Sequence, residues 1–266
     1  FSLSANAFLN GEKLFKSGMY FGSFSANRVT PEWKIRLSLA GSYNKSDFTL
    51  GEATIISSSS SRSFSGLIVK SLSDHWSVGA YFSAFYSTYS NINFSLSPAP
   101  AIEFDLFPYS QSTKRQLRFL YRVGFQAVKY LEETIYEKTS ENLWKESLSL
   151  TLELKQPWGN ATASLEASHY LHDFSKNRLV VYGQLSFRLF KGFNYNIDFR
   201  YSRIHDQLSL IRGGASLEEV LLRRKELATT YNYSFSMGLS FTFGSVHSKV
   251  VNPRFGDGGR GISIRF

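Results

Sequence analysis

The sequence predicts an all-β fold: a transmembrane, antiparallel up-and-down β-barrel of about twelve strands, with both termini periplasmic. Three observations predict it. Apolar and polar residues alternate over ten or more positions in several segments. Aromatic residues gather at the ends of these segments, and the connections between them are alternately short and long. Soluble strands usually run for about 5–6 residues. A strand that crosses a bilayer needs roughly 9–11 residues.

The alternation is clearest in segments 33–43, 193–202 and 230–243. In segment 193–202 one face carries Phe193, Tyr195, Ile197, Phe199 and Tyr201, and the other carries Asn194, Asn196, Asp198, Arg200 and Ser202. One apolar and one polar face, with aromatic residues at both ends, is typical of strands that face lipid outside and water inside.

The same pattern places twelve strands along the chain. Their expected ranges are 1–9, 18–29, 33–46, 62–70, 76–88, 91–106, 114–129, 142–155, 160–171, 178–190, 193–205 and 228–243. The connections on the periplasmic side are short. The outer connections are mostly longer, at 10–17, 47–61, 130–141 and 206–227, with a short one at 172–177. The serine run 57–61 is expected to be a flexible part of the second outer loop.

Composition narrows the classes of function. The 266-residue chain has no cysteine, which excludes a disulfide scaffold and thiolate metal sites. Its net charge is +9, but no cluster of Lys and Arg exceeds residues 222–225, so we expect no nucleic-acid partner. No apolar run approaches the length of a transmembrane helix. The chain begins at Phe1, and we read it as a mature or trimmed exported chain.

Segment 236–243 ends the last predicted strand with Gly238, Phe241 and Phe243 at alternating positions. It resembles the C-terminal insertion signal of outer-membrane barrels, which implies recognition by the barrel-assembly machinery. Such a strand normally ends the protein, whereas here residues 244–266 follow. We therefore expect a barrel domain, 1–243, and a periplasmic C-terminal tail, 244–266.

Three phrases extend this resemblance. They are PYSQSTKRQLRFLY (108–121), LLRRKELATTYNY (221–233) and FTFGS with VVNPRF (241–255). Together they resemble a family of predicted Gram-negative outer-membrane β-barrel proteins without an assigned activity. The resemblance implies an outer-membrane location, with lipid and lipopolysaccharide around the barrel. It implies no mechanism.

The alternation turns a charged face toward the predicted lumen. The lumen-lining residues are expected to be Lys34, Arg36, Glu103, Asp105, Lys114, Arg118, Arg122, Glu153, Glu166, Arg178, Arg188, Asp198 and Arg200. Two interpretations remain open: a plugged interior held by a ladder of ion pairs, or a narrow hydrated pore that favours anions. We expect local pairing of Glu103 and Asp105 with Lys114, Arg115 or Arg118.

Nothing in the sequence predicts catalysis. Of the five histidines, only His169 falls on the predicted lipid face, and no serine lies two residues beyond it. No HExxH, GxSxG or P-loop pattern occurs, so we predict no enzyme, no catalytic residue, no cofactor and no metal site.

Three functions follow from the barrel prediction. The first is a structural or interaction subunit that binds protein partners through loop 206–227 and tail 244–266. That loop includes a predicted short amphipathic helix at 216–227, which begins with a capping-box pattern at Ser216 and Glu219. The alternative is a narrow diffusion pore for small, anionic solutes, and the third is a lipid-modifying enzyme.

Overall fold

A computed structural model of the chain describes residues 1–51, 53–190, 192–213 and 225–241. Twelve strands form one sheet in which each strand pairs with the next, in the order β1 to β12, and every pairing is antiparallel. The predicted all-β, up-and-down arrangement of twelve strands is therefore confirmed. The strands are β1 (Ser2–Gly11), β2 (Phe15–Val29), β3 (Trp33–Leu50), β4 (Ala53–Ser71), β5 (Trp76–Ser87), β6 (Ile92–Asp105), β7 (Arg115–Tyr130), β8 (Ser140–Gln156), β9 (Gly159–Tyr170), β10 (Asp173–Phe190), β11 (Phe193–Ile204) and β12 (Tyr231–Phe241).

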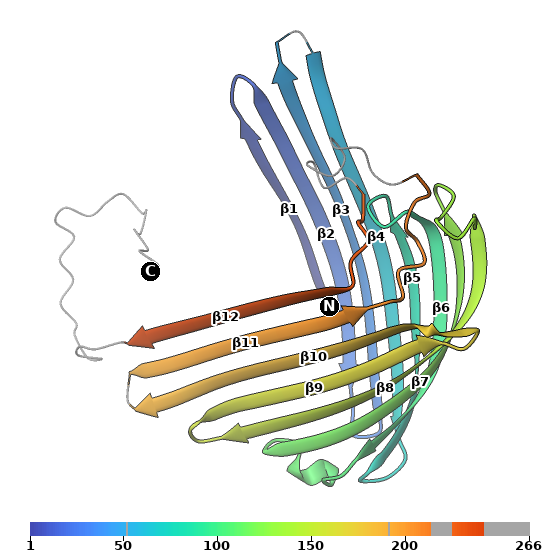
Figure 1. The fold of residues 1–266 in the computed structure, drawn as a ribbon. Helices are drawn as coiled ribbons and strands as arrows, with labels where there is room; N and C mark the ends of the chain where they lie inside the picture. Colours follow the sequence, from blue (N-terminus) through green and yellow to red (C-terminus); the bar gives the residue numbers. More distant parts are fainter. Residues whose placement is uncertain (52, 191, 214–224, 242–266) are drawn as a thin grey trace, which may run out of the picture.

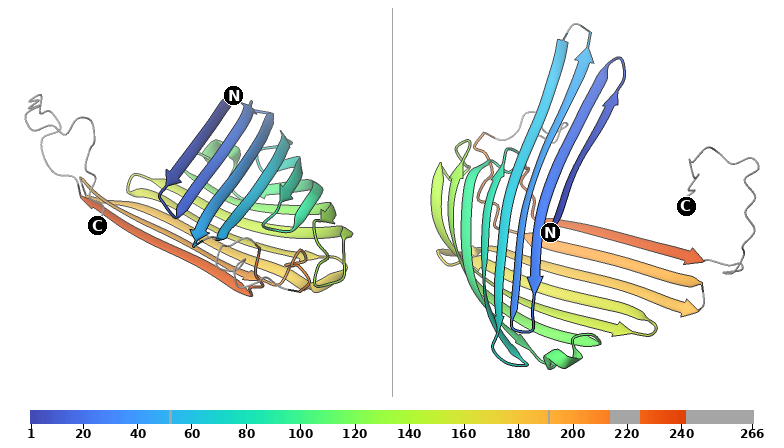
Figure 2. Two further views of the ribbon diagram at one scale, coloured as in Figure 1. Left: turned by 90° about the horizontal axis from the view of Figure 1, so that it is seen from above. Right: turned by 180° about the vertical axis from the view of Figure 1, so that it is seen from behind.

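The sheet is strongly twisted and curved, so that the first strands, β1–β4, lie at a steep angle to the last strands, β9–β12, in the view of Figure 1. Figure 2 shows the same curvature from above and from behind. No pairing joins β1 to β12 in the part of the chain that the structure describes. The twelve-stranded order is the one from which an even-numbered barrel is built, and its closing contact remains a prediction.

The β3–β4 hairpin corrects the predicted loop 47–61. β3 continues to Leu50 and β4 begins at Ala53, so the serine run 57–61 is strand and not flexible loop. Ser57–Ser61 pair in unbroken register with Ser42–Ser46 of β3, and the hydroxyls of Ser42 and Ser61 lie 2.9 Å apart. The small polar side chains interrupt the apolar alternation, but the backbone ladder needs no apolar side chain and continues through them.

Two smaller boundaries also differ. β2 begins at Phe15, which shortens the predicted loop 10–17, and β10 begins at Asp173, inside the predicted loop 172–177. The register of β10 against β9 shifts between Asp173 and Asn177, so the extra residues form a bulge. A 3-10 turn, η1 (Tyr109–Gln111), lies in the β6–β7 connection. No helix among the described residues is long and apolar enough to cross a membrane.

Several sequence predictions fall outside the described residues. These are most of the predicted helix 216–227, the tail 244–266, and Phe243 of the predicted insertion signal. Gly238 and Phe241, the other two residues of that signal, lie in β12.

Candidate channel lining

The strand register gives the sheet two chemically distinct faces. Residues directly opposite one another on paired strands share a face of the sheet. One face can therefore be followed from strand to strand, from the pair Arg36 and Leu67 to the pair Gln184 and Asp198. We call this face the polar face. It carries twelve of the predicted lining residues: Lys34, Arg36, Glu103, Asp105, Arg118, Arg122, Glu153, Glu166, Arg178, Arg188, Asp198 and Arg200. Lys114 immediately precedes β7. That this face lines a water-filled lumen remains a prediction.

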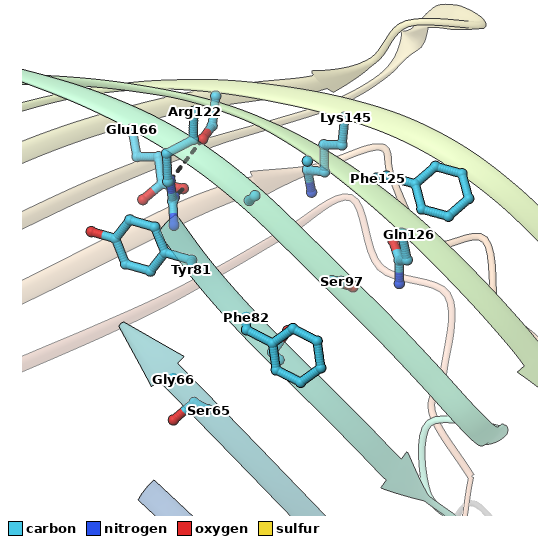
Figure 3. A pocket seen from close by; sticks show the side chains of 14 residues that line it. Ser65, Gly66, Tyr81, Phe82, Ser97, Arg122, Phe125, Gln126, Lys145 and Glu166 are labelled. Atoms are coloured by element: carbon cyan, nitrogen blue, oxygen red, sulfur yellow. Dashed lines mark hydrogen bonds and ion pairs between the residues drawn. The ribbon is translucent and has the colours of Figure 1, made fainter. Parts of the chain in front are cut away.

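Side chains on the polar face reach across one intervening strand, which shows that they converge there. Arg122 on β7 lies 2.8 Å from Glu166 on β9, and its guanidinium lies 5.2 Å from the centre of the Tyr81 ring on β5. Figure 3 shows Tyr81, Arg122 and Glu166 pointing toward one another. The hydroxyl of Tyr170 on β9 donates to Gln126 on β7, at 3.3 Å. Convergence of this kind belongs on the concave side of a curved sheet.

The cations of β7 are neutralised by carboxylates of the next two strands. Arg118 forms an ion pair with Glu153, and Arg122 pairs with Glu166 while its Nε donates to the hydroxyl of Ser147 at 3.1 Å. These pairs run along the wall of the sheet, between strands that are neighbours or next-neighbours, and not across an interior.

The expected pairing of Glu103 and Asp105 with β7 cations differs from the structure. Asp105 lies opposite Arg118 in the register, but its Oδ1 accepts the backbone N–H of Leu117, at 3.2 Å, and the carboxylate that pairs with Arg118 is Glu153. The reason is that Glu153 approaches Arg118 from the neighbouring strand β8. The prediction considered only carboxylates close to Arg118 in the sequence, and Glu153 is far from it in the sequence.

Other cations of the polar face have no such partner. Lys34 and Arg36 on β3, Arg188 on β10 and Arg200 on β11 form no salt bridge with any described residue. The positive charge of this face is therefore uneven, with compensated cations on β7 and uncompensated ones on β3, β10 and β11.

Residues 205–212, which we call the strap, follow β11 and lie against the polar face. The Asp206 carboxylate is 3% exposed and pairs with two cations, Lys145 Nζ at 3.0 Å and Arg178 Nε at 2.8 Å. Leu208 is buried in an apolar cluster on the same face with Val128, Tyr130, Leu143 and Tyr170.

Backbone contacts fix the far end of the strap. Ile211 forms an antiparallel bridge with Thr134 in the β7–β8 connection, and the N–H of Ile135 donates to Leu210 at 2.8 Å. The amide of Asn91, in the β5–β6 turn, donates to the carbonyls of Ser209 and Glu132. The strap thus joins two other connections, β5–β6 and β7–β8, at one end of the sheet. The spacing of the predicted strands placed this segment in the outer loop 206–227, without a contact to the sheet. The alternation of Asp206, Leu208 and Leu210 was the signal that one side of it is covered.

The opposite face is apolar and aromatic. Trp76, Phe104 and Phe119 form a row across β5, β6 and β7, with ring centres 4.8 and 6.4 Å apart. A polar cluster interrupts this face: Glu146 lies 2.7 Å from His169 Nε2 and accepts a 2.6 Å hydrogen bond from Tyr121. The His169 ring contacts Glu146, the Tyr170 carbonyl and Phe174, so its contacts among the described residues supply a carboxylate and no hydroxyl.

Known proteins resemble this chain in structure rather than in sequence. No family model matches the chain, and no curated protein matches it. Among solved structures, the chain is similar to the NanC porin in a rhombohedral crystal form. The match has a TM-score of 0.44 and 10% sequence identity, and it covers 91% of this chain and 99% of the porin.

Proposed function

We propose that this chain is an outer-membrane channel for small, anionic solutes. The observation that carries the proposal is the polar, concave face of the twelve-stranded sheet, on which Arg188, Arg200 and Arg36 lack carboxylate partners among the described residues. The aromatic outer face supports a location in the lipid of the outer membrane, where strands alternate between lipid and lumen.

The charge distribution supports a preference for anions. An arginine whose charge is cancelled by an adjacent carboxylate adds little to the potential of a pore, whereas an unpaired arginine in a narrow, low-dielectric surround attracts anions. Arg118 and Arg122 belong to the first kind, and Arg188 and Arg200 to the second. A filled lumen held by ion pairs describes β7–β9 well, but it leaves Arg188 of β10 and Arg200 of β11 without a carboxylate partner among the described residues.

The test is the single-channel conductance of the refolded chain in a planar bilayer, with the reversal potential measured in a salt gradient. The intact chain should conduct and prefer anions, and Arg188→Ala with Arg200→Ala should move the reversal potential toward zero. Arg203→Ala is the matched control, because Arg203 lies on β11 but on the opposite face from Arg200. A folded chain that does not conduct, or an equal shift with Arg203→Ala, would count against the channel.

The structural or interaction role remains the second candidate. The strap folds onto the polar face, so residues 205–212 contribute a packed element and not an extended docking loop. This leaves less of the predicted docking loop 206–227 free for a partner.

A further inference from the structure

Two prolines interrupt the hydrogen-bonded ladder in the middle of β6. Proline has no N–H to donate and is rare in an interior strand. Pro98 and Pro100 are paired on the β5 side, opposite Phe82 and Ala80. On the β7 side the ladder stops after Leu96 opposite Ala127 and resumes, without a shift in register, at Ala101 opposite Arg122.

The position of this gap shows which way the missing donors face. Only the ladder toward β7 is broken, so the absent N–H groups of Pro98 and Pro100 are those that would have met β7. The uninterrupted register sets Phe125 opposite Pro98 and Val123 opposite Pro100. We call residues 97–100 and 123–126 the seam. In lipid every backbone N–H and C=O group must form its hydrogen bond within the sheet. Because two donors are missing at the seam, β6 and β7 separate there more easily than other neighbouring strands do.

A cavity of about 370 Å³ adjoins the seam, and residues of both seam strands line it. Its lining includes Ala99 from β6 and Gly124 from β7. Ser97, Gln126 and Arg122, which also line it, are labelled in Figure 3. The volume is within the range of small-molecule sites. A Cβ on Gly124 would lie 3.3 Å from the Cβ of Ala99, so the absence of a side chain at Gly124 keeps this space open.

The lining combines hydrogen-bond donors with apolar rings. Tyr81, Ser83 and Ser97 carry hydroxyls with no hydrogen-bond partner among the described residues, and Arg122 uses Nε and Nη2 but not Nη1. Arg122 is paired with Glu166, which also lines the cavity, and Lys145 is a second cation of the lining. The lining therefore holds two cations and one carboxylate beside these hydroxyl donors, which suits an anionic group rich in acceptors. Phe82 and Phe125 also line the cavity, although the register assigns both to the apolar face.

We propose that the cavity binds the carboxylate or phosphate head of an anionic amphiphile, whose hydrocarbon chain passes through the seam between β6 and β7 to the apolar face. The head would lie near Arg122 and the serine and tyrosine hydroxyls, and the chain near Phe82 and Phe125. Such a site opens the polar face sideways to the bilayer and is separate from conduction along the barrel.

Photo-crosslinking in phosphatidylcholine nanodiscs tests this site. One arm uses palmitate with a diazirine at the start of its chain, next to the carboxylate, and the other uses phosphatidylglycerol with a diazirine close to its head, so that the two sources of the anion are distinguished. Peptide mapping should find saturable labelling at the seam and its cavity, at Ser97 or Gln126, by at least one probe. Arg122→Gln should weaken that labelling by about tenfold, the effect of losing a hydrogen bond to a charged group.

The seam itself is tested by Pro98→Val with Pro100→Val, which restores both donors. Polar-face labelling should fall by about tenfold, while labelling of Phe119 on the apolar face stays unchanged. Ala80→Val with Ala84→Val is the matched control, since it adds the same side chains to the same face of β5 and no donor.

Gly124→Ala gives a second variant, which narrows the cavity at Ala99 while both prolines of β6 stay in place, and it should also reduce the labelling. Conductance measured on the same variants separates this proposal from the channel, because closing the seam should leave conduction intact. Labelling that is not saturable, or that is unaffected by both the proline and the Gly124 variants, would overturn the proposal.

Discussion

The carboxylate of Asp206 is almost completely enclosed and holds two cations at once, Lys145 and Arg178. Removal of one partner from a buried ion pair costs about 3–5 kcal/mol, because the remaining charges lose their compensation. Here the two cations keep 31% and 39% exposure, and solvent lowers the cost to about 1–2 kcal/mol. Asp206 is thus the electrostatic anchor of the strap.

Asp206→Asn should therefore release the strap in a substantial fraction of molecules. About 1–2 kcal/mol corresponds to a five- to thirtyfold change in the docked population. We expect a larger and noisier single-channel conductance and a stronger preference for anions, since Lys145 and Arg178 become unpaired. Asp173→Asn removes the charge of an exposed carboxylate of the same sheet and serves as control. Identical traces for Asp206→Asn and the intact chain would refute this anchoring role.

Glu146 and His169 make a different prediction, because they lie on the apolar face. His169→Leu leaves the Glu146 carboxylate with Tyr121 as its one remaining side-chain partner of those described, and should destabilise the barrel by about 1–2 kcal/mol. Glu146→Leu removes the carboxylate itself, the group that is costly to leave without a partner, so it should be neutral or stabilising. Urea unfolding in lipid bilayers measures both free energies. The double variant, with both side chains apolar, should unfold no more easily than the intact chain, and equal losses for the two single variants would contradict this asymmetry.

At the scale of the strand, alternation was sufficient to find every element of the sheet, because a two-residue period is a direct consequence of strand geometry. It could not fix the ends. β3 and β4 continue through the serine run 57–61 because the ladder depends on backbone groups, which the side-chain pattern does not report. The face of each lining residue also followed from alternation, whereas the carboxylate partners of Arg118 and Arg122 required knowledge of which strands become neighbours.

The strap was the element that sequence patterns described least well. Its anchors lie on β8, β10 and two turns, far away in the sequence, and nothing local to residues 205–212 indicates them. Leu208 and Leu210 show that the segment is covered, but they do not show by what. Long-range packing of this kind is a property of the assembled sheet.

A disulfide can lock the strap in place at the bridge between Thr134 and Ile211. This is the only isolated β-bridge among the described residues. Paired residues of an antiparallel bridge have Cα atoms at a separation that a disulfide spans. The chain has no native cysteine, so Thr134→Cys with Ile211→Cys gives one defined crosslink. The oxidised variant should conduct like the intact chain, and it should suppress the extra conductance of Asp206→Asn until a reductant is added.

The control for this crosslink is each cysteine alone, which should respond to neither oxidant nor reductant. Oxidation that leaves the conductance of the Asp206→Asn background unchanged would show that movement of the strap does not control the pore.

For the whole molecule, the decisive property is closure of the sheet. β1 and β12 are antiparallel, because twelve strands alternate in direction, and the polar face falls on even-numbered residues in both strands. If the two edges pair, polar side chains of β1 can lie beside polar side chains of β12, and apolar beside apolar. The two faces of the sheet then continue around the whole circumference without a bulge. A slip of one residue would set polar side chains against apolar ones across the closing contact, so closure is limited to registers that pair even-numbered residues of β1 with even-numbered residues of β12.

Closure predicts which cysteine pairs can form in a bilayer. Asn6→Cys should form an intramolecular disulfide with a cysteine at one of positions 234, 236 or 238, which lie on the same face of β12, once the chain is refolded in lipid. Ala7→Cys with the same partners supplies the matched control, since residue 7 points to the other face. Electrophoresis without reductant separates the outcomes. Disulfides that form only between two chains would show that β1 and β12 each pair with another molecule, and the closed barrel, with the channel proposed from it, would then be wrong.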